Sequence, residues 1–179
     1  MSKQTRAPQQ GDTVATMKTT LGDIKILLFP DAAPKAVENF VTHAKNGYYN
    51  GIIFHRVIPD FMIQGGGFID RDGELVHKEA PNNVVGEFAA NGFKGNDLHH
   101  AEGVLSMARA MDKNSASSQF FICVADCGYL DGQYAAFGAL SDENSLAVAK
   151  AISTAKTTSV GYYNDVPVYP IVIKTIKIK

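Results

Sequence analysis

The sequence predicts a mainly β domain, a closed antiparallel barrel of eight strands capped by two α-helices. Short β-rich runs recur along the 179 residues, and only two segments repeat their apolar residues at helical spacing. Because those two segments do not alternate regularly with the strand runs, a doubly wound parallel sheet is disfavoured. Closure into a barrel removes the exposed edges that an open antiparallel sheet would present.

The expected strands start with a hairpin. The runs TVATMKT and DIKILLF, within residues 13–29, flank Leu21 and Gly22, where the chain can reverse because glycine tolerates positive φ. Six more runs are rich in strand-forming residues, and the last ends in the strictly alternating TIKIK. Their ranges are 52–57, 61–65, 103–108, 119–124, 134–138 and 170–178.

Two helices are expected. The first covers residues 33–46, because Pro34 suits a first helical turn, an apolar stripe at helical spacing follows it, and Gly47 can end it. The second covers residues 142–153, with Ser141 as its N-cap.

The chain is expected to form one domain. Residues 1–12 are polar and contain nothing large enough to anchor them to a core, so they are predicted to be a flexible tail before a domain at 13–179. Residues 68–102 are rich in Gly, Asn and Asp without a clear period, which predicts a long loop that is functional or wraps the domain.

Composition excludes several classes of function. Apolar residues make up 45% of the chain, and 17 Lys and Arg against 18 Asp and Glu leave a net charge of -1, so no general affinity for nucleic acid is expected. No apolar run reaches the ~18 residues of a membrane span, and the start MSKQTRAPQQGD lacks the apolar region of a secretory signal, so a cytoplasmic protein without membrane contact is expected. Cys123 and Cys127 form a C-x3-C pair that matches neither the redox nor the zinc spacing, which predicts free thiols.

The segment FHRVIPDFMIQGGG, which begins at Phe54, is the densest in candidate functional residues. As an extended strand it places Phe54, Arg56 and Ile58 on one face. An arginine among Phe, Met and Gln is costly to bury without partners, which favours a position at a cleft. The alternative is equally compatible with this segment alone: Arg56 pairs with a surface carboxylate, and Phe61 and Met62 are ordinary core.

Two later segments add candidates. GVLSMAR and SASSQFFICV form strand-like runs, and Gln119 and Phe121 share a face because they are two residues apart. GYLDGQYAAFG places Tyr129 and Leu130 before an Asp-Gly turn and Tyr134 after it. Taken separately, these residues are also compatible with plain core strands, one surface glutamine and packed aromatic rings.

Other motifs give no support for metal, phosphate or hydrolytic chemistry. His99 and His100 are adjacent, so in an extended chain they point in opposite directions, and they are expected to be solvated in a loop. The Gly65–Gly67 run matches neither dinucleotide nor P-loop spacing, and no GxSxG occurs. No metal and no cofactor are predicted.

Together these segments resemble the cyclophilin family of peptidyl-prolyl cis-trans isomerases, over about residues 13–178 and in the bacterial form. FHRVIPDFMIQGGG is highly specific, and GVLSMAR, SQFFICV and YLDGQYAAFG follow in the family's order. The resemblance implies the family's eight-stranded antiparallel barrel with two helices.

The resemblance also implies site residues. The family's catalytic arginine falls on Arg56. The other positions that contact substrate are the proline pocket, two polar positions, the rim that grips the residues before proline, and two less secure aromatic positions; in that order they are Phe61, Met62, Phe121, Leu130, Gln64, Gln119, Ala108, Arg109, Tyr129 and Tyr134. Tyr129 stands where the family often has Trp, Tyr134 where it often has His, Arg109 where many eukaryotic members have Asn, and Gly67 where many have Asp.

The implied partners are proline-containing peptides and unfolded or folding proteins, bound by a monomer. Cyclosporin, which the family binds, is expected to bind weakly, because the Tyr129 phenol replaces a directional indole N–H.

The reaction needs a donor more than a nucleophile. Amide resonance sets a barrier of ~18–20 kcal/mol, although cis and trans X-Pro forms differ by only about 0.5–1 kcal/mol. In the twisted transition state the prolyl nitrogen regains a lone pair, so a donor such as Arg56 binds that state better than either planar form. Two other classes of function are alternatives: a non-catalytic module or chaperone that only holds proline segments, and a barrel that encloses a small ligand.

Overall fold

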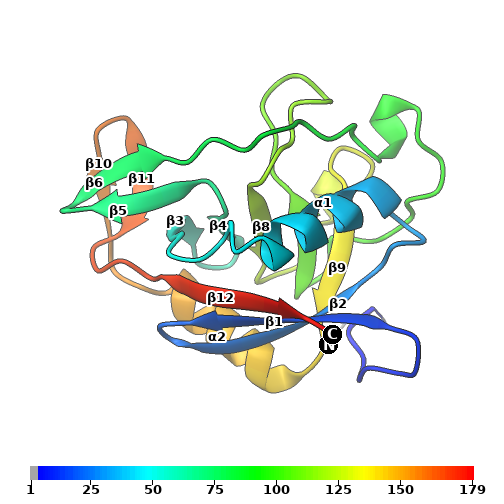
Figure 1. The fold of residues 1–179 in the computed structure, drawn as a ribbon, viewed down its shortest axis with the longest axis horizontal. Helices are drawn as coiled ribbons and strands as arrows, with labels where there is room; N and C mark the ends of the chain where they lie inside the picture. Colours follow the sequence, from blue (N-terminus) through cyan, green and yellow to red (C-terminus); the bar gives the residue numbers. More distant parts are fainter. Residues whose placement is uncertain (1–3) are drawn as a thin grey trace.

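The computed structural model describes residues 4–179, and its core is one curled sheet of eight strands. The strand order is β12-β1-β2-β9-β7-β8-β4-β3, and every neighbouring pair in the sheet is antiparallel (Figure 1). The bounds of these strands are β1 Thr13–Thr19, β2 Gly22–Leu28, β3 Phe54–Ile58, β4 Met62–Gly65, β7 Val104–Met107, β8 Phe120–Cys123, β9 Ala136–Leu140 and β12 Ile173–Ile178.

The main sheet does not close into the predicted barrel. The edge strands β3 and β12 form no ladder with each other. Instead, the segments just before them meet in an isolated bridge between Ile53 and Val172, with backbone bonds such as Ile173 N–H to the Ile52 carbonyl at 2.8 Å. The sheet is therefore a half-barrel whose gap is spanned by a few hydrogen bonds.

Two short hairpins lie outside this sheet, and the sequence patterns did not predict them. One, β5 (Phe68–Arg71) and β6 (Glu74–His77), occupies the start of the predicted long loop. The other pairs β10 (Thr157–Val160) with β11 (Tyr163–Pro167). Most residues of their strands are exposed or half-buried, so these strands have no repeating apolar face that a sequence pattern could reveal. Both hairpins lie at the same end of the molecule in Figure 1.

The two helices lie where the sequence predicts them. Helix α1 (Pro34–Lys45) buries the ring of Phe40 against Tyr49, Phe120 and Phe137 inside the curled sheet. Helix α2 (Glu143–Ser153) packs on β2. Its N-cap is Asp142 and not the predicted Ser141: the Asp142 carboxylate accepts the Ser145 N–H at 2.7 Å.

The long segment after β6 is fastened to the core by side chains. Glu87 is buried, and its carboxylate accepts the backbone N–H groups of Lys35 and Ala36 at 3.2 and 2.7 Å. These N–H groups belong to the first turn of α1, which has no side-chain N-cap of its own. The Asn96 amide donates to the carbonyls of Glu87 and Ala136. The segment therefore wraps the domain and caps a helix. It contains a short 3-10 turn at Ala89–Asn91, and a second such turn, Gly128–Leu130, lies between β8 and β9.

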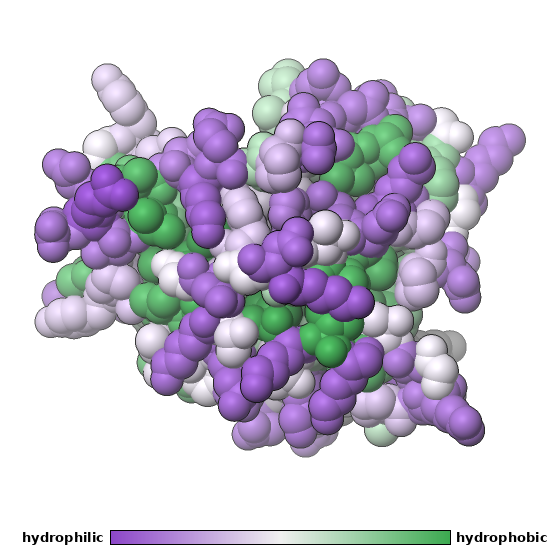
Figure 2. Space-filling model, viewed as in Figure 1, coloured by the Kyte–Doolittle hydropathy of each residue, from purple (hydrophilic) through white to green (hydrophobic). Residues whose placement is uncertain are grey.

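The predicted tail is in part described. Its first three residues lie outside the described residues, while the Gln4 side chain exchanges two hydrogen bonds with the His99 backbone and Arg6 pairs with Asp12 at 2.6 Å. The domain boundary near residue 13 stays a prediction. None of the helices within residues 4–179 has the length and apolar character to cross a membrane. Apolar groups are scattered over a mostly hydrophilic surface on the face drawn in Figure 2.

Candidate active site

The candidate site lies on the outer face of the sheet, opposite the core. Strand residues alternate between the two faces. On β8, Phe120 and Ile122 belong to the core inside the sheet, whereas Phe121 and Cys123 belong to a second apolar cluster outside it. On β4, Ile63 points inward and Met62 joins the outer cluster. Alternation thus uses one strand to build both the fold and the site.

Strand pairing places the polar and aromatic candidates in one row. Gln64 on β4 lies opposite Arg56 on β3 and opposite Phe121 on β8. On the other side of Phe121 lies Ser106 of β7. Because neighbouring strand backbones are ~4.8 Å apart, the Cα atoms of Arg56 and Phe121 are about 10 Å from each other, with Gln64 between them.

A β-bulge in β3 gives Arg56 its orientation. Phe54 pairs with Gly65 and Arg56 with Gln64, so three residues of β3 face two of β4 and His55 is the extra one. The predicted common face of Phe54 and Arg56 is therefore wrong: Phe54 is in the core and Arg56 is exposed on the outer face. A bulge shifts the alternation by one residue, and here it turns the guanidinium outward.

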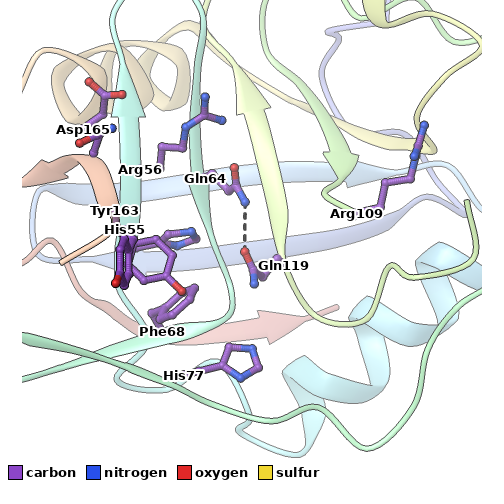
Figure 3. A pocket seen from close by; sticks show the side chains of 11 residues that line it. His55, Arg56, Gln64, Phe68, His77, Arg109, Gln119, Tyr163 and Asp165 are labelled. Carbon is purple, nitrogen blue, oxygen red and sulfur yellow. Dashed lines mark hydrogen bonds between the residues drawn. The ribbon is translucent and has the colours of Figure 1, made fainter. Parts of the chain in front are cut away.

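Arg56 is free to bind a ligand. Its guanidinium makes no hydrogen bond or ion pair with any residue in the described part of the chain, so the surface ion pair considered from the sequence does not form. Beside it, the Gln64 amide donates to the Gln119 Oε1 at 3.0 Å, drawn as a dashed line in Figure 3.

A small pocket opens next to Arg56. Its volume is about 140 Å³, below the ~300–1,000 Å³ of sites that take drug-sized molecules. Nine of the predicted residues line it: Arg56, Phe61, Met62, Gln64, Ala108, Arg109, Phe121, Leu130 and Tyr134. A pocket of this size suits one side chain with an apolar ring.

Two predicted residues lie at its margin. Gln119 bonds Gln64 but does not line the small pocket. Tyr129 is 70% exposed, with its ring centroid 6.1 Å from that of Phe61. Arg109 closes the other side of the pocket. Its guanidinium lies over the Tyr134 ring, with Cζ 4.8 Å from the ring centroid, and it donates hydrogen bonds to the Gln133 carbonyl.

A buried polar network supports the pocket from behind, and the sequence did not predict it. His100 is fully buried, not solvated as predicted; its ring accepts or donates bonds to Asp131 at 2.8 Å and to Ser106 at 2.9 Å. The same ring stacks on that of Phe121, with the ring centroids 6.1 Å apart and an angle of 16° between the ring planes. His99 is half-exposed and bonds both Asp126 and Asp131. Only the Asp131-Gly132 turn motif pointed to this region, and it gave no sign of a partner for Asp131.

The protonation states in this network follow from burial and hydrogen bonding. Burial lowers the pKa of His100, although Asp131 opposes that effect. Hydrogen bonds that the protonated His99 ring donates to Asp126 and Asp131 raise the pKa of His99. For Asp131, burial disfavours the charged form, but bonds from the backbone and ring of His100 and from His99 outweigh it and hold its pKa below the ordinary range.

The two cysteines of the chain lie beside the site. Cys123 and Cys127 are buried free thiols in the outer cluster, as predicted. No three His, Cys, Asp or Glu side chains among residues 4–179 are placed to hold a metal ion.

The chain matches a known family along nearly its whole length. The family model for cyclophilin type peptidyl-prolyl cis-trans isomerase/CLD matches residues 14–178. The chain belongs to this family. It is 44% identical over 171 residues to peptidyl-prolyl cis-trans isomerase A of Dickeya dadantii, covering 93% of this chain and 84% of the relative. A peptidyl-prolyl cis-trans isomerase of Acinetobacter baylyi is 40% identical over 94% of this chain and 86% of its own.

Solved cyclophilins have the same fold. A crystal structure of a Cryptosporidium parvum cyclophilin type isomerase matches with a TM-score of 0.74 at 30% identity, covering 94% of this chain and 98% of that one. Another, determined in the presence of the dipeptide Ala-Pro, matches with a TM-score of 0.72 at 31% identity, covering 93% and 98%. The resemblance stated from sequence motifs is confirmed, and the function is that of a cyclophilin, isomerisation of peptidyl-prolyl bonds.

Proposed function

We propose that Arg56 is the catalytic donor and that the small pocket beside it holds the proline ring of the substrate. A single observation carries the proposal: Arg56 has no partner among the described residues and shares a cross-strand row with Gln64 and Phe121, which line the same pocket. A permanently charged donor next to a niche for one apolar ring is the arrangement that amide rotation requires.

The reaction is a rotation without bond breaking. When the acyl group turns, conjugation is lost, the prolyl nitrogen becomes pyramidal, and its lone pair becomes available to a donor. The guanidinium of Arg56 donates to that nitrogen and holds the twisted state more tightly than either planar form. A guanidinium carries its charge throughout the physiological range, so no proton transfer is needed.

The pocket and the amides hold the substrate during rotation. Phe61, Met62, Phe121 and Leu130 fix the ring by contact. Gln64, oriented by its bond to Gln119, offers its remaining amide N–H and its carbonyl oxygen to the substrate backbone. The backbone at Ala108 and Arg109 is proposed to grip the residues before proline, and Tyr129 and Tyr134 to border the pocket.

The test is NMR exchange between the cis and trans signals of an Ala-Pro peptide, with and without catalytic amounts of protein. Acceleration by the native chain and its loss in Arg56→Ala support the proposal. A chain that binds the peptide but leaves the exchange rate unchanged would instead be a binding module, because binding alone stabilises ground states without lowering the barrier.

The cellular setting is also a proposal. We infer that the protein is cytoplasmic, because buried free thiols such as Cys123 and Cys127 persist in a reducing compartment. We also propose that it is a monomer and that it assists folding proteins. Cell fractionation and light scattering test the two parts.

A further inference from the structure

A second and larger cavity adjoins the proline pocket. Its volume is about 770 Å³, and it shares Arg56, Gln64 and Arg109 with the small pocket. A polypeptide whose proline occupies the small pocket would therefore place a neighbouring residue at the opening of the larger one. The established family and activity leave the use of this cavity open.

The far wall of this cavity comes from the two hairpins outside the main sheet. The ring of Phe68, on β5, packs against the rings of His55 and of His77 on β6, with centroid distances of 4.5 and 5.2 Å. From the other hairpin, the Tyr163 ring meets Phe68 edge-on at 5.1 Å. We call these four residues, His55, Phe68, His77 and Tyr163, the aromatic wall; Figure 3 shows them grouped on one side of Arg56.

The aromatic wall is incomplete on its solvent side. Phe68 and His55 are buried, but Tyr163 is 44% exposed, and its neighbour Tyr162 is fully exposed while also lining the cavity. Exposed tyrosines beside a stack of rings offer faces and edges that a further ring can cover. Burying such a ring would remove apolar surface from water and add edge-to-face contacts.

Two groups beside the cavity are suited to contact with an aromatic ring. Burial lowers the pKa of His55 to about 4, with Arg56 and His77 adding to the effect, so its imidazole is a neutral ring at physiological pH. Arg56 has no ion-pair partner within residues 4–179 and could lie over an aromatic face. The charged residues that line the cavity are of both signs, Arg56 and Arg109 against Asp165.

We propose that the aromatic wall and Tyr162 form a specificity subsite that binds an aromatic side chain within two residues of the isomerised proline. The inference rests on the proposed function, because it requires the proline to occupy the small pocket. It makes the β10–β11 hairpin a specificity element of this chain, acting through Tyr162 and Tyr163.

The experiment measures cis-trans exchange by NMR for the parent peptide Ala-Ala-Pro-Ala-Ala and for derivatives with Phe or Leu at each of the four other positions. Each catalysed rate is compared with the uncatalysed rate of the same peptide. Leu is the matched control because it adds apolar bulk without a ring. At one position at least, kcat/KM for the Phe peptide should exceed that for the Leu peptide by about 2- to 12-fold, the range that aromatic pairing supports.

The variants Tyr162→Ala and Tyr163→Ala identify the source of that preference. Tyr162 is fully exposed, so its removal should leave the fold intact, and Tyr163→Ala is checked by its amide spectrum. Each should reduce the Phe-over-Leu ratio, most strongly in the double variant. Tyr169→Ala, at an 81% exposed residue that lines neither pocket, is the control and should change nothing.

The outcomes separate the two proposals. Failure of the native chain to accelerate exchange in the parent peptide would overturn the proposed function. Normal acceleration without a Phe-over-Leu preference at any position, or a preference that survives in the double variant, would overturn the subsite and leave the proposed function in place.

Discussion

Arg56 and Phe121 pair with the same residue, Gln64, from opposite sides across three adjacent strands. This shared register places the proposed donor and the pocket floor on one sheet, with their Cα atoms about 10 Å apart. A catalytic donor must be held in place, since a displacement of about 1 Å can cost ~100-fold in rate.

Removing the Arg56 guanidinium should slow the reaction without unfolding the chain. We expect Arg56→Ala to lower kcat/KM by ~10²–10³-fold, the usual effect of losing one preorganised donor. The measurement is NMR exchange on an Ala-Pro peptide. Arg71→Ala, an exposed arginine on β5 outside both pockets, should retain the native rate. Equal rates in the native chain and in Arg56→Ala would exclude Arg56 from the mechanism.

Gly67 leaves room for the Gln119 side chain. A Cβ at Gly67 would lie 2.5 Å from Gln119 Cγ and 2.6 Å from its Nε2, so Gly67→Ala should displace Gln119 and break its bond to Gln64. Loss of this bond should reduce kcat/KM by about 2- to 10-fold. Gln119→Ala should have a similar effect, and the double variant should be no slower than Gln119→Ala alone. Additive losses would mean that Gly67 acts by another route.

Tyr129 should limit inhibition by cyclosporin. Its exposed phenol lies at the pocket edge, next to Phe61, and lacks the indole N–H that the family often offers. Tyr129→Trp should strengthen inhibition by up to about tenfold, the range of one added hydrogen bond. Inhibition titrations of the native chain, Tyr129→Trp and the control Tyr169→Trp would check this. Unchanged inhibition in Tyr129→Trp would refute the explanation.

The buried carboxylate of Glu87 should stabilise the fold. Because it caps the first turn of α1, Glu87→Ala leaves the N–H groups of Lys35 and Ala36 without an acceptor. We expect the free energy of unfolding to fall by about 1–3 kcal/mol, measured by denaturant titration. Glu79→Ala, with a side chain that is 89% exposed, should change it by no more than about 0.5 kcal/mol. Similar losses in both variants would show that the cap contributes nothing specific.

His55 should make the fold sensitive to acid. The unfolded chain takes up this proton near its ordinary pKa of 6.5, and the folded protein only at a pKa of about 4. The stability that the neutral ring contributes is therefore complete above about pH 6.5 and is lost as the pH falls toward 4, by about 3 kcal/mol in total. Denaturant titrations from pH 4 to 7 should show this slope in the native chain and a flatter one in His55→Asn.

His99 provides a control of opposite sign. Its pKa is raised by the hydrogen bonds that its ring donates to Asp126 and Asp131, so its contribution is present below about pH 6.5 and is lost as the pH rises through that raised pKa. His99→Asn should therefore lose stability at acid pH and converge with the native chain at alkaline pH. If the stability of His55→Asn falls as steeply toward acid pH as that of the native chain, groups other than His55 cause the acid sensitivity.

Much of the fold could be read from local patterns. The hairpin of residues 13–28, the six other strands of the main sheet and both helices follow from alternation, helical spacing and turn residues, which depend on near neighbours in the chain. The two small hairpins did not, because most residues of their strands are exposed or half-buried and form no repeating apolar face. The Glu87 cap and the burial of His100 join residues far apart in sequence, which no local pattern reports.

The sequence by itself determined which residues could form the site: their motifs contain Arg56, the glutamines and the apolar pocket residues. Only the tertiary structure decided how they face one another. The bulge at His55 reverses the face of Arg56 relative to the simple alternation, and a bulge depends on how a partner strand pairs. Likewise, the cavity beside Arg56 exists because two hairpins from distant parts of the chain pack together. Composition and spacing set the chemistry available, whereas contacts between distant segments set its geometry.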